Sequence, residues 1–216
     1  MIQFDNVTAT YKKNVGIFNI SFKVKKGDMV FIMGPTGAGK STILKTIYKD
    51  MLIDSGKIIL DKDDISSINS NMHTSSIRRD IGMIFQDFKL LEDRTVFENI
   101  ALPLRIEGYS EKQTVEAVRE SLNKVSLNGS GRFYPLQLSG GEQQRVCIAR
   151  ALVKKPKIIL ADEPTGNLDP NISDEILDLL ELCTKEGSTV LMSTHNFPLI
   201  KPRKRKFIEL SKGRMV

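Results

Sequence analysis

The sequence contains no tryptophan, only two cysteines and no apolar run of membrane-spanning length. A spanning helix needs roughly 18 or more consecutive apolar residues, so we expect no membrane span. Cys147 and Cys183 lie far apart and match no metal-binding spacing, which predicts cytosolic thiols rather than a disulfide or a zinc site. The first residues carry neither a basic nor an apolar segment of the export type, so we expect no signal peptide.

Excess charge is also missing from most of the chain. The net charge is +6, and residues 197–216 alone contain seven basic residues and one acid, so the remainder is neutral. This basic segment fits either a solvated loop beside a final strand or a surface for nucleic acid or anionic lipid. With 40% apolar and 27% charged residues among 216, the composition is that of one globular α/β domain.

One motif organises the chain, the sequence GPTGAGKST at residues 34–42. It fits the phosphate-loop pattern G-x-x-x-x-G-K-[ST], and it follows an apolar strand pattern and precedes a helical one. Glycines let a backbone curl closely around phosphates with its N–H groups inward. Lys40 is expected to reach the β- and γ-phosphates, and the Ser41 hydroxyl to ligate Mg²⁺. The pattern predicts that the chain binds a nucleoside triphosphate. The expected contacts in this loop are Gly34, Pro35, Thr36, Gly37, Ala38, Gly39, Lys40, Ser41 and Thr42.

Polar side chains follow the other predicted strands. Gln86, Asp162, Glu163 and His195 each lie at or just past the end of an apolar run. Because ligands bind at the carboxyl ends of parallel strands, we expect these side chains to meet at one site. Gln86 and Asp162 suit Mg²⁺, Glu163 suits the orientation or deprotonation of water, and His195 suits the γ-phosphate. Upstream, Tyr11 fits either stacking on the base or a packing role.

A second motif, LSGGEQQR at residues 138–145, precedes another helical pattern. Ser139 and Glu142 have the spacing of a capping box, which predicts a helix start. A helix start that exposes the N–H groups of Gly140 and Gly141 beside a serine hydroxyl is also an anion site. One chain rarely needs two anion sites unless both act on one ligand.

The order of elements predicts an α/β fold with a parallel core sheet. Alternating residues at 2–4 and 21–24 predict antiparallel strands near the N-terminus. Residues 87–137 carry helical patterns and capping-box spacings, which predict a helical subdomain inserted into the core. The core would then comprise residues 1–86 and 138–216.

The phosphate loop, LSGGEQQR, the strand ending in two carboxylates and the later histidine together resemble the ATP-binding-cassette (ABC) ATPases, over essentially the whole chain. The resemblance implies one nucleotide-binding domain, residues 1–216, that hydrolyses ATP with Mg²⁺. By this resemblance Tyr11 stacks on adenine, Glu163 is the catalytic base and His195 is the switch histidine. Asp169 would belong to a loop that contacts a second copy.

The resemblance also accounts for two anion sites in one chain. ABC ATPases pair head to tail, so Ser139 and Gly141 of one chain would cover the γ-phosphate held by the other. An ATP-sandwich homodimer is therefore expected. The chain departs from the family in two places. Asn196 follows His195 where many cassettes have aspartate, and the basic run at residues 201–206 is denser than the family pattern requires.

Residues 85–99, FQDFKLLEDRTVFEN, resemble more specifically the FtsE family of cell-division ATPases. That resemblance implies an FtsX-like membrane partner docking near Gln86–Leu91, control of cell-wall hydrolysis, and a peripheral location at the cytoplasmic face of the inner membrane. Phe88, Leu90 and Leu91 fit either the docking groove or the core of the helical subdomain.

Other functions stay open at this point. The ATPase of a lipoprotein-release or drug/peptide exporter shares residues 167–169, and the segment 93–95 is what favours division. DNA-repair and chromosome-maintenance ATPases carry a long coiled coil between their halves. Because the helical segment here contains no heptads, no nucleic-acid partner is expected. An adaptor that binds nucleotide without turnover is a further alternative, against which Glu163 argues.

Overall fold

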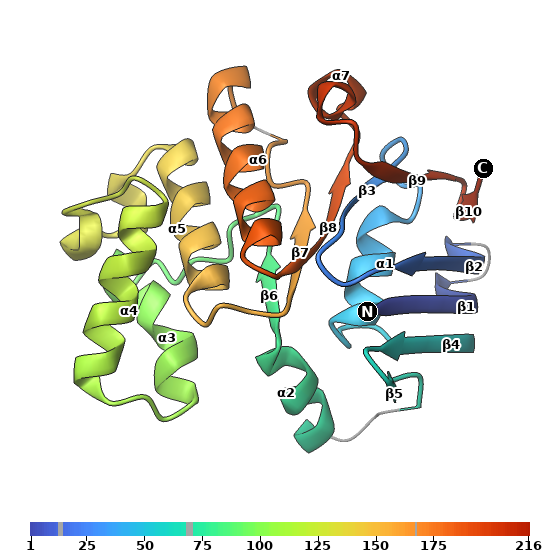
Figure 1. Ribbon diagram of the computed structural model, residues 1–216, viewed down its shortest axis with the longest axis horizontal. Coiled ribbons are helices and arrows are strands. Elements are labelled where there is room, and N and C mark those ends of the chain that lie inside the picture. Colours follow the sequence, from blue (N-terminus) through green and yellow to red (C-terminus); the bar gives the residue numbers. More distant parts are fainter. Residues whose placement is uncertain (13–14, 68–70, 167) are drawn as a thin grey trace.

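The computed structural model describes residues 1–12, 15–67, 71–166 and 168–216, and contains two sheets with helices around them (Figure 1). Its strands are β1 (Ile2–Lys12), β2 (Val15–Val24), β3 (Met29–Met33), β4 (Ser55–Leu60), β5 (Asp63–Asp64), β6 (Ile81–Ile84), β7 (Ile158–Asp162), β8 (Thr189–Thr194), β9 (Lys206–Ser211) and β10 (Arg214–Met215). Its α-helices are α1 (Lys40–Ile47), α2 (Asn71–Arg79), α3 (Val96–Ile106), α4 (Glu111–Lys124), α5 (Gly140–Leu152), α6 (Pro170–Lys185) and α7 (Phe197–Ile200). Short 3-10 helices are η1 (Ser130–Arg132), η2 (Pro135–Gln137) and η3 (Lys201–Arg203).

The larger sheet has six strands in the order β10-β9-β3-β8-β7-β6. Neighbouring strands are parallel except for β9 and β10. Strands β7 and β8 are buried along their whole length, which explains the apolar runs at residues 158–161 and 190–192 within them. The carboxyl ends of β3, β6, β7 and β8 share one edge of the sheet. The predicted α/β class with a parallel core sheet is confirmed.

The smaller sheet is antiparallel, in the order β2-β1-β4-β5. Its first two strands are longer than the segments 2–4 and 21–24 that the sequence indicates. Register shifts between Phe4 and Val7, and again further along, break the simple alternation of apolar and polar residues in β1. Because β1 extends to Lys12, Tyr11 lies within this strand.

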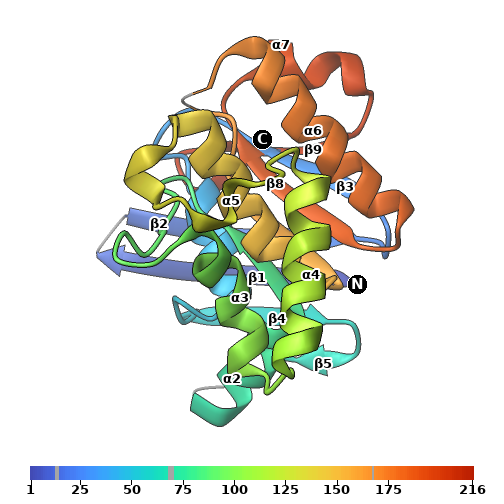
Figure 2. The ribbon, with the colours of Figure 1, turned by 90° about the vertical axis from the view of Figure 1, so that its left-hand side faces the viewer.

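Helices α3, α4 and α5 stand side by side on one side of the molecule (Figure 2). Capping boxes begin α3 at Thr95 and α4 at Ser110, as their spacing predicts. Helix α3 continues past Pro103, although a proline inside a helical pattern usually ends or kinks the helix. The proline removes one N–H donor, while the fully buried Leu104 holds the last turn against the core. Val115 has helical spacing to the buried Val118 and Leu122 of α4, but it is 47% exposed.

Two hydrophobic cores lie on opposite faces of the larger sheet. Alternate residues of β3 belong to different cores, as the pleat of a strand requires. Met29 and Phe31 pack with α3 to α6, whereas Val30 and Ile32 pack with α1 and the antiparallel sheet. Helix α1 thus joins the two sheets. The boundary of the helical subdomain at residues 87–137 stays a prediction.

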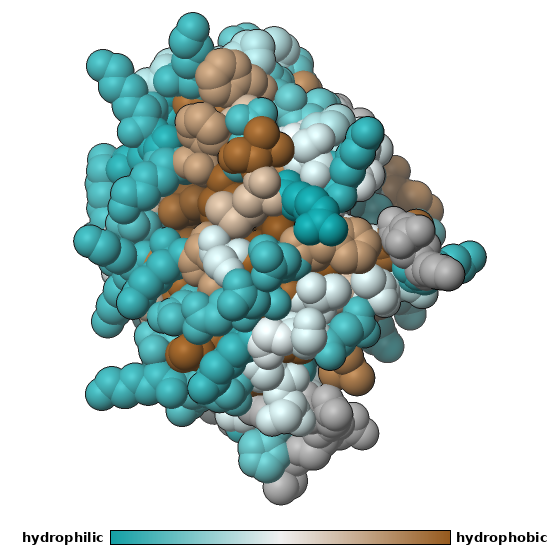
Figure 3. Space-filling view, turned by 90° about the vertical axis from the view of Figure 1, so that its right-hand side faces the viewer, coloured by the Kyte–Doolittle hydropathy of each residue, from teal (hydrophilic) through white to brown (hydrophobic). Residues whose placement is uncertain are grey.

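The face on which β9 and β10 lie is a mosaic of hydrophobic and hydrophilic areas (Figure 3). Exposed apolar residues of α7, β9, β10 and the position after β10 are Phe197, Phe207, Met215 and Val216. This face is thus no uniformly charged surface. Within the described ranges of the chain, none of the helices has the length and apolar character needed to cross a bilayer.

Candidate active site

The phosphate loop connects β3 to α1 and requires glycine at particular positions. Gly34 has φ of +147°, and a Cβ there would lie 2.3 Å from the carbonyl oxygen of Leu210. Gly39 has φ of +102° and is the N-cap of α1 without a capping side chain. The first N–H groups of α1 consequently remain available to an anion, as the motif predicts.

Lys40 lies over the phosphate loop and makes three polar contacts. Its Nζ donates to the carbonyl oxygens of Gly34 at 2.8 Å and Pro35 at 3.1 Å. It also forms an ion pair with Glu163, with Nζ 3.1 Å from Oε1, and only 4% of the lysine side chain is exposed. The ammonium group of Lys40 is thus held between the start of the phosphate loop and Glu163.

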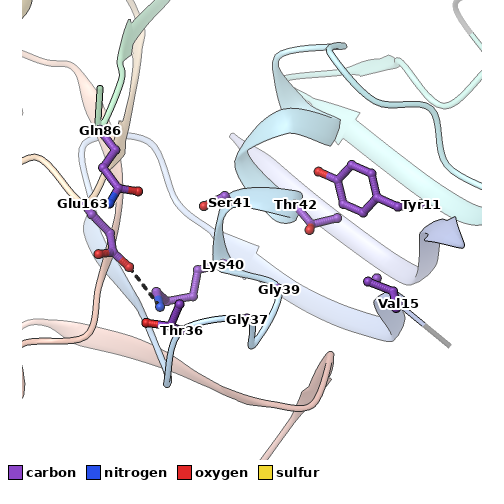
Figure 4. Close-up of a pocket in the computed structure, with 11 residues that line it drawn as sticks. Tyr11, Val15, Thr36, Gly37, Gly39, Lys40, Ser41, Thr42, Gln86 and Glu163 are labelled. Carbon is purple, nitrogen blue, oxygen red and sulfur yellow. Dashed lines mark ion pairs between the residues drawn. The ribbon is translucent and has the colours of Figure 1, made fainter. Parts of the chain in front are cut away.

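Glu163 immediately follows β7 and is held from several sides. Its backbone has φ of +44°, a conformation that costs free energy for a non-glycine residue. Its N–H donates to Ser193 Oγ at 2.9 Å, and its Oε2 lies 2.8 Å from Nδ1 of His195. These contacts and the Lys40 ion pair direct the carboxylate toward the phosphate loop (Figure 4).

Asp162 ends β7 beside the phosphate loop. Its Oδ1 accepts from Ser41 Oγ at 2.9 Å and from Ser193 Oγ at 2.6 Å. Ser193 thus joins the carboxylate of Asp162 to the backbone N–H of Glu163, because β7 and β8 pair with Asp162 opposite Ser193. Sequence reasoning missed Ser193, which reads as one more residue of the β8 strand. The feature that could have indicated Ser193 is its polar side chain near the end of a strand that lies next to β7, the strand that leads into the two acids.

A cavity of about 260 Å³ opens above the phosphate loop. Its lining comes from that loop together with Tyr11, Val15, Gly16, Gln86 and Glu163. Figure 4 shows Gln86 and Glu163 at one end and Tyr11 and Val15 at the other. Such a shape suits a long ligand whose phosphates lie at the lysine end and whose flat ring lies at the tyrosine end.

Tyr11 belongs to the open end of the cavity. Its side chain is 51% exposed, and Lys45 Nζ lies 5.7 Å from the ring centroid. An exposed aromatic ring beside the cavity remains consistent with the predicted stacking role. Val15 and Gly16 were not predicted to line the site, because β2 starts closer to the phosphate loop than the sequence indicates.

The LSGG segment does not line this cavity. Ser139 is the N-cap of α5 and forms the predicted capping box with Glu142. Hydrogen bonds from the hydroxyl and the backbone N–H of Ser139 lower the pKa of the Glu142 carboxyl below its ordinary value. Gly140 and Gly141 form the first turn. Thus the two predicted anion sites of one chain belong to different elements, and the LSGG segment contributes no residue to the cavity lining.

The segment after Gln86 is held by an arginine of α5. Phe88 and Lys89 have φ of +57° and +50°, and their carbonyl oxygens accept from Arg150 at 2.7 Å and 2.5 Å. Leu90 packs against the helical core, whereas Leu91 is 42% exposed. The predicted apolar docking residues are therefore divided between core and surface.

A groove of about 410 Å³ adjoins this segment. It is lined by α2, β6, α3 and α5, including Phe85, Leu102, Ile106 and Arg150. Leu102 and Ile106 are 38% and 72% exposed. Arg150 lines the groove and also bonds to the backbone of the segment that follows Gln86, and Gln86 lines the cavity.

Two further predicted positions are helix caps. Asp169 is the N-cap of α6 and accepts from the N–H of Ile172 at 3.1 Å. Asn196 caps α7 by accepting from the N–H of Leu199 at 3.2 Å. Capping explains why asparagine serves at 196, since Asn and Asp cap helices equally well. Asn167 of the 167–169 motif lies outside the described residues.

Comparisons with known proteins identify relatives along the whole chain. The family model described as ABC transporter matches residues 17–166. The cell division ATP-binding protein FtsE of Escherichia coli K12 is 45% identical over 216 residues, which cover 100% of this chain and 97% of the relative. FtsE of Mycobacterium tuberculosis is 42% identical over 218 residues and covers 100% and 94%.

Solved structures show the same fold. The dimeric structure of MJ0796, described as a bacterial ABC transporter cassette, matches with a TM-score of 0.90 at 37% identity, covering 100% of this chain and 96% of that one. A structure of MJ0796 described as a post-hydrolysis state bound to ADP and Pi also has a TM-score of 0.90, at 36% identity.

Proposed function

Because this chain belongs to the ABC transporter family of ATPases, and within it to the FtsE cell-division branch, we propose that it is the ATP-hydrolysing subunit of a membrane-associated complex in bacterial cell division. The observation that carries the proposal is the meeting of Lys40, Asp162 and Glu163 at one sheet edge, in a chain similar over its full length to FtsE proteins.

Lys40 and Tyr11 hold the nucleotide in this proposal. Lys40 exchanges the carbonyl oxygens of its own loop for β- and γ-phosphate oxygens, and the free N–H groups at the start of α1 add further donors. Tyr11 stacks on the adenine at the open end of the cavity. The contacts that hold the Lys40 ammonium group over the phosphate loop support this role.

Glu163 acts as the base that orients and deprotonates the attacking water, and His195 positions it. Once Lys40 engages phosphate, the contact to His195 Nδ1 remains to fix the carboxylate. Hydrolysis proceeds by in-line attack of water on the γ-phosphate, and catalysis is mostly positioning and charge stabilisation.

Mg²⁺ fits the donors at the foot of the cavity. Ser41 Oγ, the carboxylate of Asp162 and the amide of Gln86 are hard oxygen donors of the kind that Mg²⁺ prefers, and Ser41 already touches Asp162. The ion would neutralise phosphate charge there.

A head-to-tail homodimer completes the site. The exposed Ser139 and the turn of Gly140, Gly141 and Glu142 share no cavity with Lys40 in one chain. A second copy would bring its LSGG segment over the γ-phosphate, where helix N–H groups and the serine hydroxyl stabilise negative charge. The relative MJ0796 has been solved as a dimer, which supports this arrangement.

The membrane partner, of FtsX type, docks in the groove beside the Gln86–Leu91 segment. Exposed Leu102 and Ile106 suit an apolar helix of the partner, and Arg150 transmits its position to the backbone at Phe88. The chain then acts at the cytoplasmic face of the inner membrane, where dimer closure does mechanical work on the partner that controls cell-wall hydrolysis. The alternative is the same ATPase serving a lipoprotein-release or drug/peptide exporter.

The experiment is a pull-down of tagged Glu163→Gln chain with ATP from detergent-solubilised membranes, with the bound protein identified. We expect a membrane protein whose depletion blocks division. Recovery of a transporter subunit instead would move the function to export, and recovery of soluble protein alone would contradict membrane coupling.

A matched pair of surface variants tests the groove. Ile106→Asp, inside the groove, should lower recovery of the partner about tenfold, because an unpaired carboxylate would be buried against apolar atoms. Val115→Asp places the same charge on an exposed valine of α4 outside the groove and should leave recovery unchanged. Equal losses would contradict docking in the groove.

A further inference from the structure

The basic run near the C-terminus is largely neutralised by acids of the same chain. Arg203 ends η3, and its guanidinium donates to Asp174 Oδ1 at 2.8 Å and to Asp178 Oδ1. Glu181 Oε1 lies 3.8 Å from the same group. The side chain of Arg203 is only 14% exposed, unlike a surface lysine.

Two neighbours complete this pattern. Arg205 pairs with Glu181 at 3.2 Å, and Lys206 pairs with Asp28 at 3.0 Å. Three of the five cations between residues 201 and 206 therefore have acidic partners within the chain. The run is thus internally compensated, and this argues against the alternative of an anionic lipid surface.

The acids around Arg203 form one face of α6. Asp174, Asp178 and Glu181 follow one another at spacings of four and three residues, so they lie above one another on the helix. Arg203 also donates to the backbone carbonyl oxygen of Asp174 at 3.2 Å. One partly buried guanidinium thus holds η3 against two turns of α6.

The two elements joined by Arg203 both lead to the active site. Helix α6 begins after Asp169, six residues beyond Glu163. On the other side, α7 and η3 follow His195 directly through its neighbour Asn196. Two contacts therefore join the segment that runs from Glu163 into α6 to the segment that runs from His195 into η3. At one end His195 Nδ1 lies 2.8 Å from Glu163 Oε2, and at the other end Arg203 bonds to α6.

His195 has little other support. Its side chain is 50% exposed, so packing alone does not fix its ring. Its position depends on the backbone between β8 and α7, and α7 is anchored through the buried Ile200 and through η3. A shift of η3 along α6 would move the imidazole relative to Glu163.

We propose that Arg203 is a positioning residue for ATP hydrolysis, which holds His195 against Glu163 by fixing η3 to the acidic face of α6. This inference rests on the proposed roles of Glu163 and His195. Arg203 touches neither the nucleotide cavity nor the phosphate loop, so it acts through the geometry of the pair and leaves ATP binding unaffected.

The test measures kcat and KM for ATP together with thermal unfolding. Arg203→Met keeps the length and apolar stem of the side chain and should lower kcat about tenfold, with KM within about twofold of wild type. Arg203→Lys keeps a charge that reaches one carboxylate and should recover part of the lost kcat. Arg205→Met is the matched control, and its kcat should stay within about twofold of wild type.

Asp178→Asn separates positioning from general stabilisation. Alone, Asp178→Asn should lower kcat by several-fold. The double variant with Arg203→Met should lose much less kcat than the product of the two single losses, because both substitutions remove the same contact. An unchanged kcat in folded Arg203→Met, a loss confined to KM, no recovery with lysine, or multiplicative effects would each overturn the inference.

Glu163→Gln, measured alongside, separates this inference from the proposed function. If Glu163→Gln is inactive and Arg203→Met is fully active, the role of Arg203 fails and that of Glu163 stands. If Glu163→Gln hydrolyses ATP at the wild-type rate, the proposed function of Glu163 fails, and the positioning role of Arg203 fails with it.

Discussion

At the scale of single residues, the site is held by a few groups that each serve two partners. Glu163 contacts both Lys40 and His195, and Ser193 contacts both Asp162 and the backbone of Glu163. Sharing of this kind couples Asp162, the proposed metal ligand, to Glu163, the proposed base. A change at Ser193 should therefore alter both stability and turnover.

Ser193→Ala removes one donor from the buried Asp162 and leaves the N–H of Glu163 unpaired. We expect the free energy of unfolding to fall by about 1–3 kcal/mol, and kcat to fall about tenfold as Glu163 loses its orientation. Urea denaturation and phosphate release measure the two effects. Ser188→Ala is the control, because its hydroxyl bonds only to Pro156 O at the opposite end of the strand, and kcat should not change.

A lower stability with unchanged turnover in Ser193→Ala would show that Ser193 supports the fold alone. Sequence reasoning found Lys40, Asp162 and Glu163 because the chemistry of phosphate binding restricts their types and spacing. It missed Ser193, since a serine at the end of an apolar strand carries no spacing signal. Only the register of β7 with β8 places it between the carboxylate of Asp162 and the backbone N–H of Glu163.

At the scale of elements, helix caps connect structure with function. The boxes that begin α3, α4 and α5 follow from a spacing of three residues and were predictable. The extent of β1 was not, since its register shifts depend on partners far away in sequence. The Arg150 and Arg203 contacts were equally hidden, because they join elements that are 61 and 25 residues apart.

The box at α5 predicts a pH dependence of stability. Hydrogen bonds from Ser139 lower the pKa of Glu142 from its ordinary 4.5, so the folded chain binds this proton more weakly than the unfolded chain. The contribution of Glu142 to stability is therefore fully present above its pKa in the unfolded chain. It is lost as the pH falls through its lower pKa in the folded chain.

Glu142→Gln keeps the spacing of the box but removes this titration. The wild-type chain should unfold at a higher temperature than Glu142→Gln at pH 7, and the difference should shrink toward pH 3. Thermal unfolding without nucleotide measures it. Glu116→Gln removes a carboxylate from the middle of α4, and its difference in unfolding temperature from the wild type should not shrink toward pH 3. A constant difference between wild type and Glu142→Gln at both pH values would contradict the assignment.

At the scale of the whole molecule, the two predicted anion sites lie in separate places on the chain. The α/β fold was predictable because buried parallel strands read as continuous apolar runs. The motifs predicted the phosphate loop and the LSGG helix start, but not how far apart they lie. Since the LSGG segment does not line the cavity of its own chain, the site as proposed requires a second copy.

Mixing two inactive chains tests the shared site. The Lys40→Ala chain has a defective phosphate loop and an intact LSGG segment. The Ser139→Arg chain has an intact phosphate loop and a defective LSGG segment. In a head-to-tail heterodimer one site then receives both intact halves and the other receives neither. With random pairing, about a quarter of the wild-type rate should return on mixing, because half of the dimers carry one working site of two. Phosphate release against mixing ratio should peak at equal amounts. Activity that never exceeds the sum of the two chains would contradict independent composite sites, and one chain would then have to supply the whole site.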